Sequence, residues 1–243
     1  MRKEVNKLGQ PVGATVVDWR GCPRPSREML SGHYCRLEPL DPARHVVDLF
    51  NANAADMDGR MWTYLPYGPF AALEEYRAWM EATCLGGDPL FYAIVDVENG
   101  RALGLTSYLR IIPEHGSIEI GHLAYTPALQ RTRMATEATS LMLRHAFSLG
   151  YRRVEWKCNA LNEASRSAAR RFGFSFEGVF RQHVILKGRS RDTAWYAITD
   201  SDWSAIGDAH RRWLDPDNFD AKGRQFLQLS ELTAPLRRAP AQD

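Results

Sequence analysis

A short basic loop between a predicted strand and a predicted helix is the first feature of the sequence that suggests chemistry. The loop reads Gln130-Arg131-Thr132-Arg133-Met134-Ala135. The first backbone N–H groups of a helix have no partner within it, and the aligned peptide dipoles add positive potential there. Arg131 and Arg133 add further positive charge. The loop is therefore predicted to bind an anion such as a phosphate or pyrophosphate. A solvated helix entry without a ligand is the alternative.

Two regular elements must hold this loop in place. Residues 118–125 have the length and the β-branched and aromatic content of a strand, and Pro127 ends it because proline cannot donate to a β-ladder. From Met134 the apolar residues recur at helical spacing as far as Leu149, and Gly150 follows where a glycine commonly ends a helix. The sequence thus predicts a strand–loop–helix unit with the anion site at the start of its helix.

Motifs in this unit and beyond it resemble the GNAT acetyltransferases. Gln130-x-x-Arg133-x-Ala135 is similar to the family's Gln/Arg-x-x-Gly-x-Gly/Ala loop, and the flanking EIG (119–121) and ATEA (135–138) agree with it. Downstream, Asn162-x-x-Ser165 and RRFGF (170–174) resemble the family's second cofactor motif and its helix-ending Gly-Phe. The resemblance covers residues 37–203 and is nearest to the branch that contains ribosomal-protein alanine N-acetyltransferases.

The resemblance implies acetyl-coenzyme A as the co-substrate, with its pyrophosphate held by loop residues. These are Gln130, Arg131, Thr132, Arg133, Met134, Ala135 and Thr136. The pantetheine arm would enter where one strand segment splays from the strand at 153–158. That segment is His122, Leu123, Ala124 and Tyr125. Unpaired backbone groups there need a partner, which is a physical reason for binding. Asn162 would reach the pantetheine and Ser165 would hydrogen-bond the cofactor. An N-cap and a first-turn hydroxyl explain the same two residues without a ligand.

One position departs from the family pattern. The first glycine of the family's loop is Arg133 in this sequence. A glycine there lets the backbone approach the phosphates, so a Cβ narrows the fit. The Arg133 guanidinium can instead supply a fork of donors to the phosphates.

Acetyl transfer to an amine needs a proton acceptor, and the departing thiolate needs a proton. Glu119 is the leading candidate for the general base, because it lies on the strand that would carry the cofactor; pairing with an arginine on a neighbouring strand is its alternative role. His122 titrates near neutrality and is a second candidate. Regular alternation would place Glu119 and His122 on opposite faces of the strand. Tyr125 or Tyr196 is the candidate proton donor.

Composition limits the class of protein. The 243 residues carry 31 Lys and Arg against 29 Asp and Glu, a formal net charge of +2, which does not favour nucleic-acid binding. No apolar run approaches the ~20 residues of a membrane-spanning helix. No apolar segment follows the basic N-terminus, as one would in a signal peptide. The four cysteines have neither metal-ligand nor CxxC spacing. We expect a cytoplasmic protein with reduced thiols and without metal, membrane or nucleic-acid partners.

The remaining elements indicate the fold class. Strands are predicted at 34–39, 89–97, 102–112, 153–158, 174–187 and 192–198, and helices at 42–51, 73–85 and 162–172. Turn signals such as Asn99-Gly100 separate the central strands. Helices that alternate with strands after an antiparallel meander predict an α+β fold, with a mixed, mostly antiparallel twisted sheet flanked by helices. The resemblance adds the splayed pair of strands to this sheet.

The sequence divides into three predicted segments. They are an N-terminal arm (1–32), the acetyltransferase domain (33–203) and a C-terminal helical extension (204–243). In the arm, residues 12–19 are expected to add a short edge strand, although a partly ordered tail is the alternative. The extension is expected to hold a helix past residue 203 and another at 225–232, and to be a candidate contact in a homodimer. The aromatic stretch 61–70 fits a loop over a cavity, for substrate contact or for packing.

The sequence therefore predicts an acetyl-coenzyme A-dependent N-acetyltransferase of the EC 2.3.1 class that acts on a primary amine by direct transfer in a ternary complex. The acceptor is a protein N-terminal amine or a small-molecule amine. A coenzyme A-binding sensor or assembly subunit without catalysis is the alternative, which the missing loop glycine favours. A dinucleotide-binding enzyme is disfavoured because no G-x-G-x-x-G follows an early strand.

Overall fold

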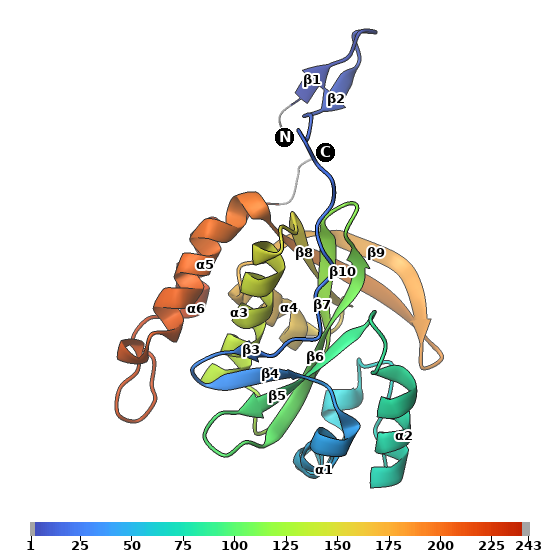
Figure 1. Cartoon of the computed structure of the whole chain (residues 1–243), viewed down its shortest axis with the longest axis vertical. Helices are drawn as coiled ribbons and strands as arrows, with labels where there is room; N and C mark the ends of the chain where they lie inside the picture. Colours follow the sequence, from blue (N-terminus) through green and yellow to red (C-terminus); the bar gives the residue numbers. More distant parts are fainter. Residues whose placement is uncertain (1–2, 240–243) are drawn as a thin grey trace.

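The computed structural model describes residues 3–239, and its centre is an eight-stranded sheet with helices on both faces (Figure 1). Its strands, in spatial order, are β3 (Leu30–Ser31), β4 (Cys35–Pro39), β5 (Leu90–Asp96), β6 (Ala102–Ile112), β7 (Ser117–Tyr125), β8 (Arg153–Asn159), β10 (Arg189–Thr199) and β9 (Ser175–Leu186). β7 and β8 are parallel, and the other neighbouring strands are antiparallel. The predicted α+β class with a mostly antiparallel sheet is confirmed.

The two faces of the sheet are covered by different helices (Figure 1). One face, called here the α2 face, packs against α1 (Pro42–Asn53) and α2 (Leu73–Thr83). The other, called the α3 face, packs against α3 (Arg133–Ser148), α4 (Glu163–Arg171) and α5 (Asp200–Leu214). Each face has its own core, because side chains of a strand point alternately to opposite faces.

Side chains alternate along β8 and point to both faces of the sheet. Val154, Trp156 and Cys158 are buried in the core of the α3 face. Glu155 and Lys157, between them, point to the α2 face. The strand therefore supplies apolar packing on one side and charge on the other.

Local signals account for the position of α3. The side chain of Thr132 accepts a hydrogen bond from the Ala135 amide at 3.1 Å, which caps the N-terminus of the helix. At the other end Gly150 adopts φ +89°, the left-handed conformation that glycine tolerates after a helix. The helix begins one residue before the predicted start and ends one residue before the predicted end.

The N-terminal arm forms a small hairpin of its own. β1 (Lys3–Val5) pairs with β2 (Pro11–Gly13) in a separate sheet that projects from the rest of the molecule (Figure 1). Asn6 stabilises the turn, because its side chain accepts hydrogen bonds from the amides of Leu8 and Gln10. The prediction of an edge strand at 12–19 is therefore wrong: this local hairpin takes Val12 and Gly13, and residues 14–29 contain no strand.

The rest of the arm is fastened to the domain. The Trp19 indole donates to the carbonyl of Glu114, and the Cys22 amide to that of Pro113, both in the β6–β7 turn. Further along, the buried carboxylate of Glu137 on α3 accepts hydrogen bonds from three consecutive amides at 2.6–2.8 Å. They belong to His33, Tyr34 and Cys35. The arm thus ends on the helix that follows the basic loop.

The first helix near the C-terminal extension begins earlier than predicted. α5 starts at Asp200 rather than past residue 203, and the Thr199 hydroxyl donates to the Asp202 carboxylate at 2.7 Å. The later short helix, α6 (Leu229–Thr233), also differs from the predicted 225–232, because Gln225 is held in a bridge to Phe219. The short turns η1 (Arg60–Trp62), η2 (Pro216–Asn218) and η3 (Ala234–Leu236) complete the element order.

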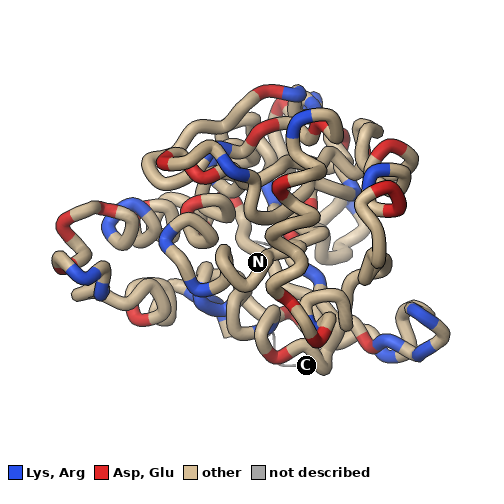
Figure 2. Tube along the Cα trace, turned by 90° about the horizontal axis from the view of Figure 1, so that it is seen from below, with Lys and Arg blue, Asp and Glu red and all other residues tan. Residues whose placement is uncertain are grey.

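The distribution of charged residues and the apolar content of the helices agree with the composition. Figure 2 shows Lys and Arg interspersed with Asp and Glu along the chain, as the net charge of +2 suggests. Within residues 3–239, no helix combines the length and the apolar content needed to span a bilayer. The four cysteines, Cys22, Cys35, Cys84 and Cys158, are free thiols.

Candidate functional site

The strands β7 and β8 run side by side only at their beginnings. Three residues of each are paired, ending with Glu119 opposite Glu155. β7 then continues to Tyr125 and β8 to Asn159 without further pairing to each other. Their facing backbone groups lie in a widening gap, where a ligand or water must satisfy them. This is the splayed pair of strands that the resemblance implied, and it includes the predicted segment His122 to Tyr125.

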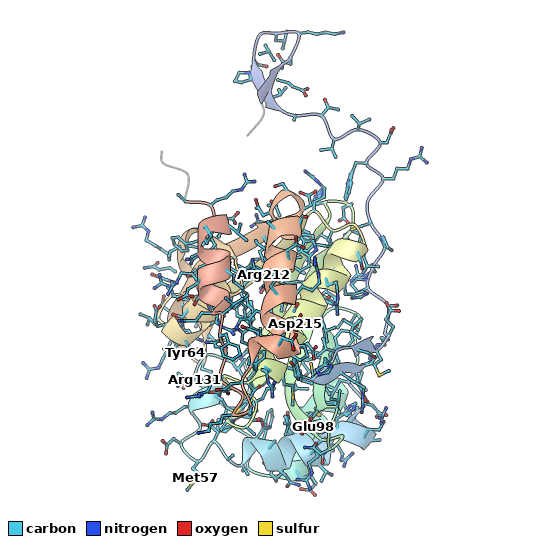
Figure 3. The ribbon with its side chains drawn as sticks, turned by 90° about the vertical axis from the view of Figure 1, so that its left-hand side faces the viewer. Met57, Tyr64, Glu98, Arg131, Arg212 and Asp215 are labelled. Carbon is cyan, nitrogen blue, oxygen red and sulfur yellow. The ribbon has the colours of Figure 1, made fainter. Side chains whose placement is uncertain are left out.

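The basic loop lies directly after the splayed end of β7. The Gln130 side chain donates to the carbonyl of Tyr125 at 2.8 Å, so it folds the loop back on the strand rather than extending from it. Arg131 adopts φ +62° and is exposed; Figure 3 labels it at the surface on the same side as Tyr64. The loop therefore presents the N-terminus of α3 next to the gap.

Only part of the predicted set of loop amides is free to bind an anion. The amide of Thr132 donates to the Leu129 carbonyl, that of Ala135 to the Thr132 hydroxyl, and that of Thr136 to the Thr132 carbonyl. Among the described residues, the amides of Arg131, Arg133 and Met134 have no such partner. The Gln130 amide donates to the Thr126 carbonyl, so three of the seven predicted loop residues have a free amide next to the gap.

The Arg133 side chain is occupied elsewhere. Its guanidinium lies over the ring of Tyr34 and over the ring of Phe219, 4.8 Å from each centroid. Tyr34 lies just after the N-terminal arm, and Phe219 belongs to the C-terminal extension. This arrangement does not match the hypothesis of a donor fork for phosphates, since cation–π contacts hold the guanidinium between two aromatic rings.

Asn162 and Ser165 occupy the positions that the ligand-free explanation gave them. The Asn162 side chain caps α4 by accepting a hydrogen bond from the Ser165 amide at 3.1 Å. The Ser165 hydroxyl accepts from the Trp156 indole of β8 at 3.0 Å, and it keeps its own proton for another partner. Both residues border the open end of β8, so capping does not exclude contact with a ligand in the gap.

Glu119 lies at the point where the two strands part, on the α2 face. It is 4% exposed, and its Oε2 is 2.7 Å from Arg110 Nη1 and 3.0 Å from Lys157 Nζ. Lys157 also pairs with Glu155 at 2.6 Å and lies over the Trp195 ring. No hydrogen bond from a described residue reaches the other oxygen, Oε1. The predicted arginine partner on a neighbouring strand is present, and one oxygen remains open.

His122 lies on the same face as Glu119, so the expectation of opposite faces is wrong. The pairing of β7 with β6 shifts register between Ala124 and Gly121, and His122 has φ +51° at this bulge. The extra residue reverses the alternation beyond it. The imidazole packs 4.9 Å from Phe91 and 5.7 Å from Tyr67 on the α2 face. Burial, with a smaller effect of Arg110, lowers the pKa of His122 to about 4.

The two candidate tyrosines lie on the opposite face. The Tyr125 hydroxyl is 3.4 Å from the Thr139 hydroxyl of α3, and burial raises the pKa of Tyr125 above its usual range. The Tyr196 hydroxyl is buried on the α3 face, where it accepts a hydrogen bond from Arg166 at 3.2 Å. Neither hydroxyl shares the face of Glu119. Burial also raises the pKa of the Cys158 thiol, which disfavours it as a nucleophile.

The aromatic stretch 61–70 packs over the α2 face. The ammonium of Lys187, at the tip of the β9–β10 hairpin, donates to the carbonyls of Trp62, Tyr67 and Gly68 at 2.8–3.2 Å. The Tyr64 hydroxyl donates to the carbonyl of Leu161, next to Asn162. The stretch therefore bridges the hairpin and the end of β8. A lone lysine in a hairpin turn gave no sequence signal for this role.

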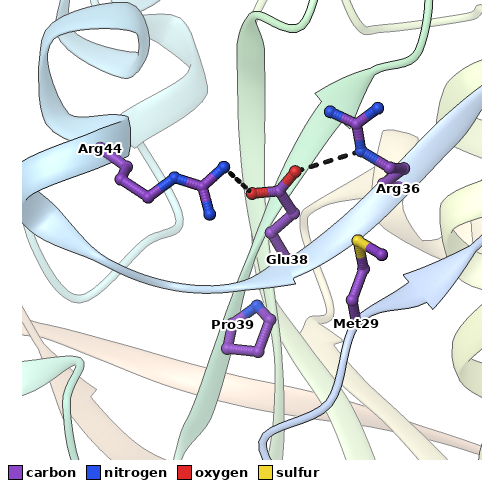
Figure 4. A pocket seen from close by; sticks show the side chains of 5 residues that line it. All are labelled: Met29, Arg36, Glu38, Pro39 and Arg44. Carbon is purple, nitrogen blue, oxygen red and sulfur yellow. Dashed lines mark hydrogen bonds and ion pairs between the residues drawn. The ribbon is translucent and has the colours of Figure 1, made fainter.

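Two hollows lie on the surface of the described chain. One, of about 380 Å³, is lined by Met29, Arg36, Glu38, Pro39 and Arg44 (Figure 4). Its charges are paired, because Glu38 binds Arg36 at 3.1 Å and Arg44 at 2.8 Å. The other, of about 580 Å³, is lined by Phe180, Arg181, Gln182 and His183 of β9. This second hollow lies beside the α2 face, since Phe180 stacks on Trp195.

Comparison with known proteins agrees with this geometry. Residues 35–175 match the family model described as an acetyltransferase (GNAT) domain. The crystal structure of a GCN5-related N-acetyltransferase from Brucella melitensis is 42% identical, has a TM-score of 0.87, and covers 89% of this chain and 99% of its own. The chain is 32% identical over 97 residues to the "Uncharacterized N-acetyltransferase YoaA" of Bacillus subtilis (strain 168), covering 40% of this chain and about half, 54%, of that relative.

A more distant structure shares the fold. The ribosomal L7/L12 alpha-N-protein acetyltransferase RimL, solved in complex with coenzyme A, is 23% identical with a TM-score of 0.58, and covers 72% of this chain and 99% of its own. The family model spans more than half of the sequence, and the Brucella structure aligns over nearly its whole length at 42% identity. The chain therefore belongs to the GNAT acetyltransferase family.

Proposed function

We propose that the protein transfers the acetyl group of acetyl-coenzyme A to a primary amine by direct attack in a ternary complex. The observation that carries the proposal is the unpaired stretch of β7 and β8 beyond Glu119 and Glu155, next to the start of α3. An extended pantetheine arm with amide groups can replace the missing ladder in that gap. The donor and the acceptor would then meet beside Glu119.

The residues present fit coenzyme A. Backbone groups of His122 to Tyr125 would receive the pantetheine, with Asn162 and Ser165 at the far side of the gap. The free amides of Arg131, Arg133 and Met134 and the α3 dipole would hold the pyrophosphate. Gln130, Thr132, Ala135 and Thr136 would shape this loop through the contacts they already make. The domain proposed to carry these parts is 33–203.

Glu119 is the proposed general base. Arg110 and Lys157 hold its Oε2, while Oε1 has no hydrogen-bond partner among the described residues and could accept the amine proton. Orientation of the two substrates supplies the larger share of the rate, since positioning is worth ~7–11 kcal/mol. Removal of the amine proton, directly or through water, would add ~10²–10⁴-fold.

Two measurements test the proposal. Calorimetry with acetyl-coenzyme A should detect binding, and free thiol should be released when amines or N-terminal peptides are added. Binding without thiol release across a broad amine panel would instead indicate a coenzyme A-binding sensor. Absence of binding at millimolar acetyl-coenzyme A would contradict both.

A further inference from the structure

Most of the charged side chains at the centre of the α2 face pair off with one another. A continuous network joins Arg110, Glu119, Lys157, Glu155, Arg153 and Glu177 through contacts of 2.5–3.0 Å. It contains three positive and three negative groups. Arg191 of β10 points to the same face, since it alternates with Thr193 and Trp195, and Trp195 lies opposite Lys157. No carboxylate of a described residue pairs with Arg191.

Two donors on this strand are buried without an acceptor. They are the Nε of Arg191 and the indole Nε1 of Trp195. Burial of a hydrogen-bond donor without a partner is costly, so such donors point to a ligand or to water. His122 Nδ1, on the same face, is likewise buried without a partner. With the Tyr67 hydroxyl, four of the seven buried polar side-chain atoms without a partner among the described residues belong to side chains on the α2 face.

A hollow lies on β9, next to Val184, the residue that pairs with Arg191. Across the hairpin Arg191 pairs with Val184, and Thr193 pairs with Phe180, so three residues of β9 oppose Asp192 alone. These residues, Arg181 to His183, form a bulge that lines the hollow of about 580 Å³ together with Phe180. The Asp192 carboxylate is engaged by the Gln182 amide at 2.7 Å. The hollow is lined by the exposed Arg181 and adjoins the hairpin position of Arg191.

We propose that the acceptor amine carries a carboxylate, which Arg191 binds while the amine lies beside Glu119. The inference rests on the proposed acetyl transfer. A guanidinium and a carboxylate form paired, charge-assisted hydrogen bonds, which satisfy a partly buried arginine. A purely cationic acceptor such as a polyamine would add positive charge beside an arginine that has no counter-ion. Burial lowers the pKa of Arg191; the nearby charge of Glu119 raises it and that of Arg110 lowers it, which agrees with its position near the gap.

The experiment uses matched amines. The three amines phenylalanine, phenylalaninamide and phenethylamine share a benzyl side chain. The first has a carboxylate, the second an uncharged carboxamide and the third neither group. A fourth amine, 1-amino-2-phenylethylphosphonate, has a phosphonate in place of the carboxylate. Thiol release from acetyl-coenzyme A should show a higher kcat/KM for phenylalanine than for its amide or amine, by about 10- to 100-fold. A larger kcat/KM for the phosphonate would identify a phosphate-type anion as the ligand and overturn the carboxylate assignment.

Variants locate the preference on Arg191. Arg191→Gln should remove the preference for the carboxylate, Arg191→Lys should retain part of it, and Arg189→Gln, an exposed residue of the same hairpin, should leave it unchanged. Affinity for acetyl-coenzyme A should stay the same in all three. Acetylation without a carboxylate preference, or a weaker binding of acetyl-coenzyme A in Arg191→Gln, would overturn this inference alone. Absence of thiol release from every amine would overturn the proposed transfer as well.

Discussion

Two buried glutamates make similar contacts but have different roles. Glu38 and Glu119 are both nearly buried. Glu119 is held by Arg110 and Lys157, and Glu38 by Arg36, Arg44 and His45. Glu38 bridges Arg36 and Arg44 beside a small hollow on β4. Glu119 lies where β7 leaves β8 and keeps Oε1 open. Their surroundings, rather than their own burial, make Glu119 the candidate base.

Glu119→Gln should therefore lower kcat by ~10²–10⁴-fold, because an amide cannot accept the amine proton. Affinity for acetyl-coenzyme A, measured by calorimetry, should be nearly unchanged, since no carboxylate is needed to hold the pantetheine. Glu38→Gln is the matched control: it also removes a buried, paired carboxylate, and it should cost stability while kcat is retained. An equal loss of kcat and of affinity in Glu119→Gln would assign Glu119 a role in holding the strand rather than in catalysis.

Buried histidines should make stability depend on pH. Burial lowers the pKa of His210 to about 4, and its Nε2 donates to the Phe172 carbonyl at 2.9 Å. The unfolded chain has a histidine pKa near 6.5, so it binds more protons than the folded state between these values. The contribution of His210 to the free energy of unfolding should be complete above pH 6.5. It should fall, by roughly 3 kcal/mol in total, as the pH drops towards 4.

Urea unfolding at intervals from pH 4.5 to 7.5 measures this dependence. His210→Gln should flatten the slope between pH 5 and 6.5, because glutamine can keep the bond to Phe172 but does not titrate. His115→Gln, at an exposed turn position, should leave the slope unchanged. A slope that is the same in His210→Gln and in the parent would show that His210 does not carry it.

Residue positions that depend on backbone irregularities could not be predicted from the sequence. The spacing of Glu119 and His122 predicts opposite faces only if the strand is regular, and the bulge at His122 removes that condition. The place of the Arg133 guanidinium depends on Phe219, which is far away in the sequence. In contrast, the cap formed by Asn162 and the start of α3 depend on neighbouring residues, and local motifs predicted both.

At the scale of elements, periodicity and turn residues predicted the strands from β4 to β10 to within a few residues. The elements that differ are those stabilised by contacts the pattern does not show: β2 pairs within its own hairpin, and α6 is displaced by the bridge from Phe219 to Gln225. The contact between the β9–β10 hairpin and the stretch 61–70 belongs to the same class. It joins elements more than a hundred residues apart through Lys187.

The contact between Lys187 and the stretch 61–70 should control how well the acceptor binds at the α2 face. Lys187→Met removes donors from three carbonyls and frees the stretch 61–70 from the hairpin tip. KM for the acceptor should rise by about 10-fold, as expected for the loss of charged hydrogen bonds that position a wall of the site. Steady-state kinetics at saturating acetyl-coenzyme A measures the change. Arg189→Met, in the same turn, should not change KM; an equal rise there would attribute the effect to general loosening of the hairpin.

At the scale of the whole molecule, segments from both sides of the family domain contact α3 or its neighbours. The arm is held by the Glu137 carboxylate, and Gly32 has no room for a side chain beside it: an added Cβ would be 2.4 Å from the Glu137 carboxyl carbon. From the other end, Phe219 covers the Arg133 guanidinium and Trp213 covers that of Arg171. Arg171 in turn donates to Thr136 of α3 at 3.0 Å. The segments outside the matched family domain thus brace the helix whose start adjoins the proposed cofactor gap.

A double-mutant cycle on Arg133 and Phe219 tests this bracing role. If the cation–π contact joins the extension to α3, urea unfolding of Arg133→Ala, Phe219→Ala and the double variant should give a coupling free energy of about 0.5–2 kcal/mol. The pair Arg131 and Phe219 is the control, and its effects should add, since Arg131 is exposed on the loop. Acetyl-coenzyme A affinity should change less than about threefold in Arg133→Ala, because the guanidinium is engaged by rings. A loss of acetyl-coenzyme A affinity beyond about tenfold, without coupling to Phe219, would instead indicate that the Arg133 guanidinium binds the phosphates.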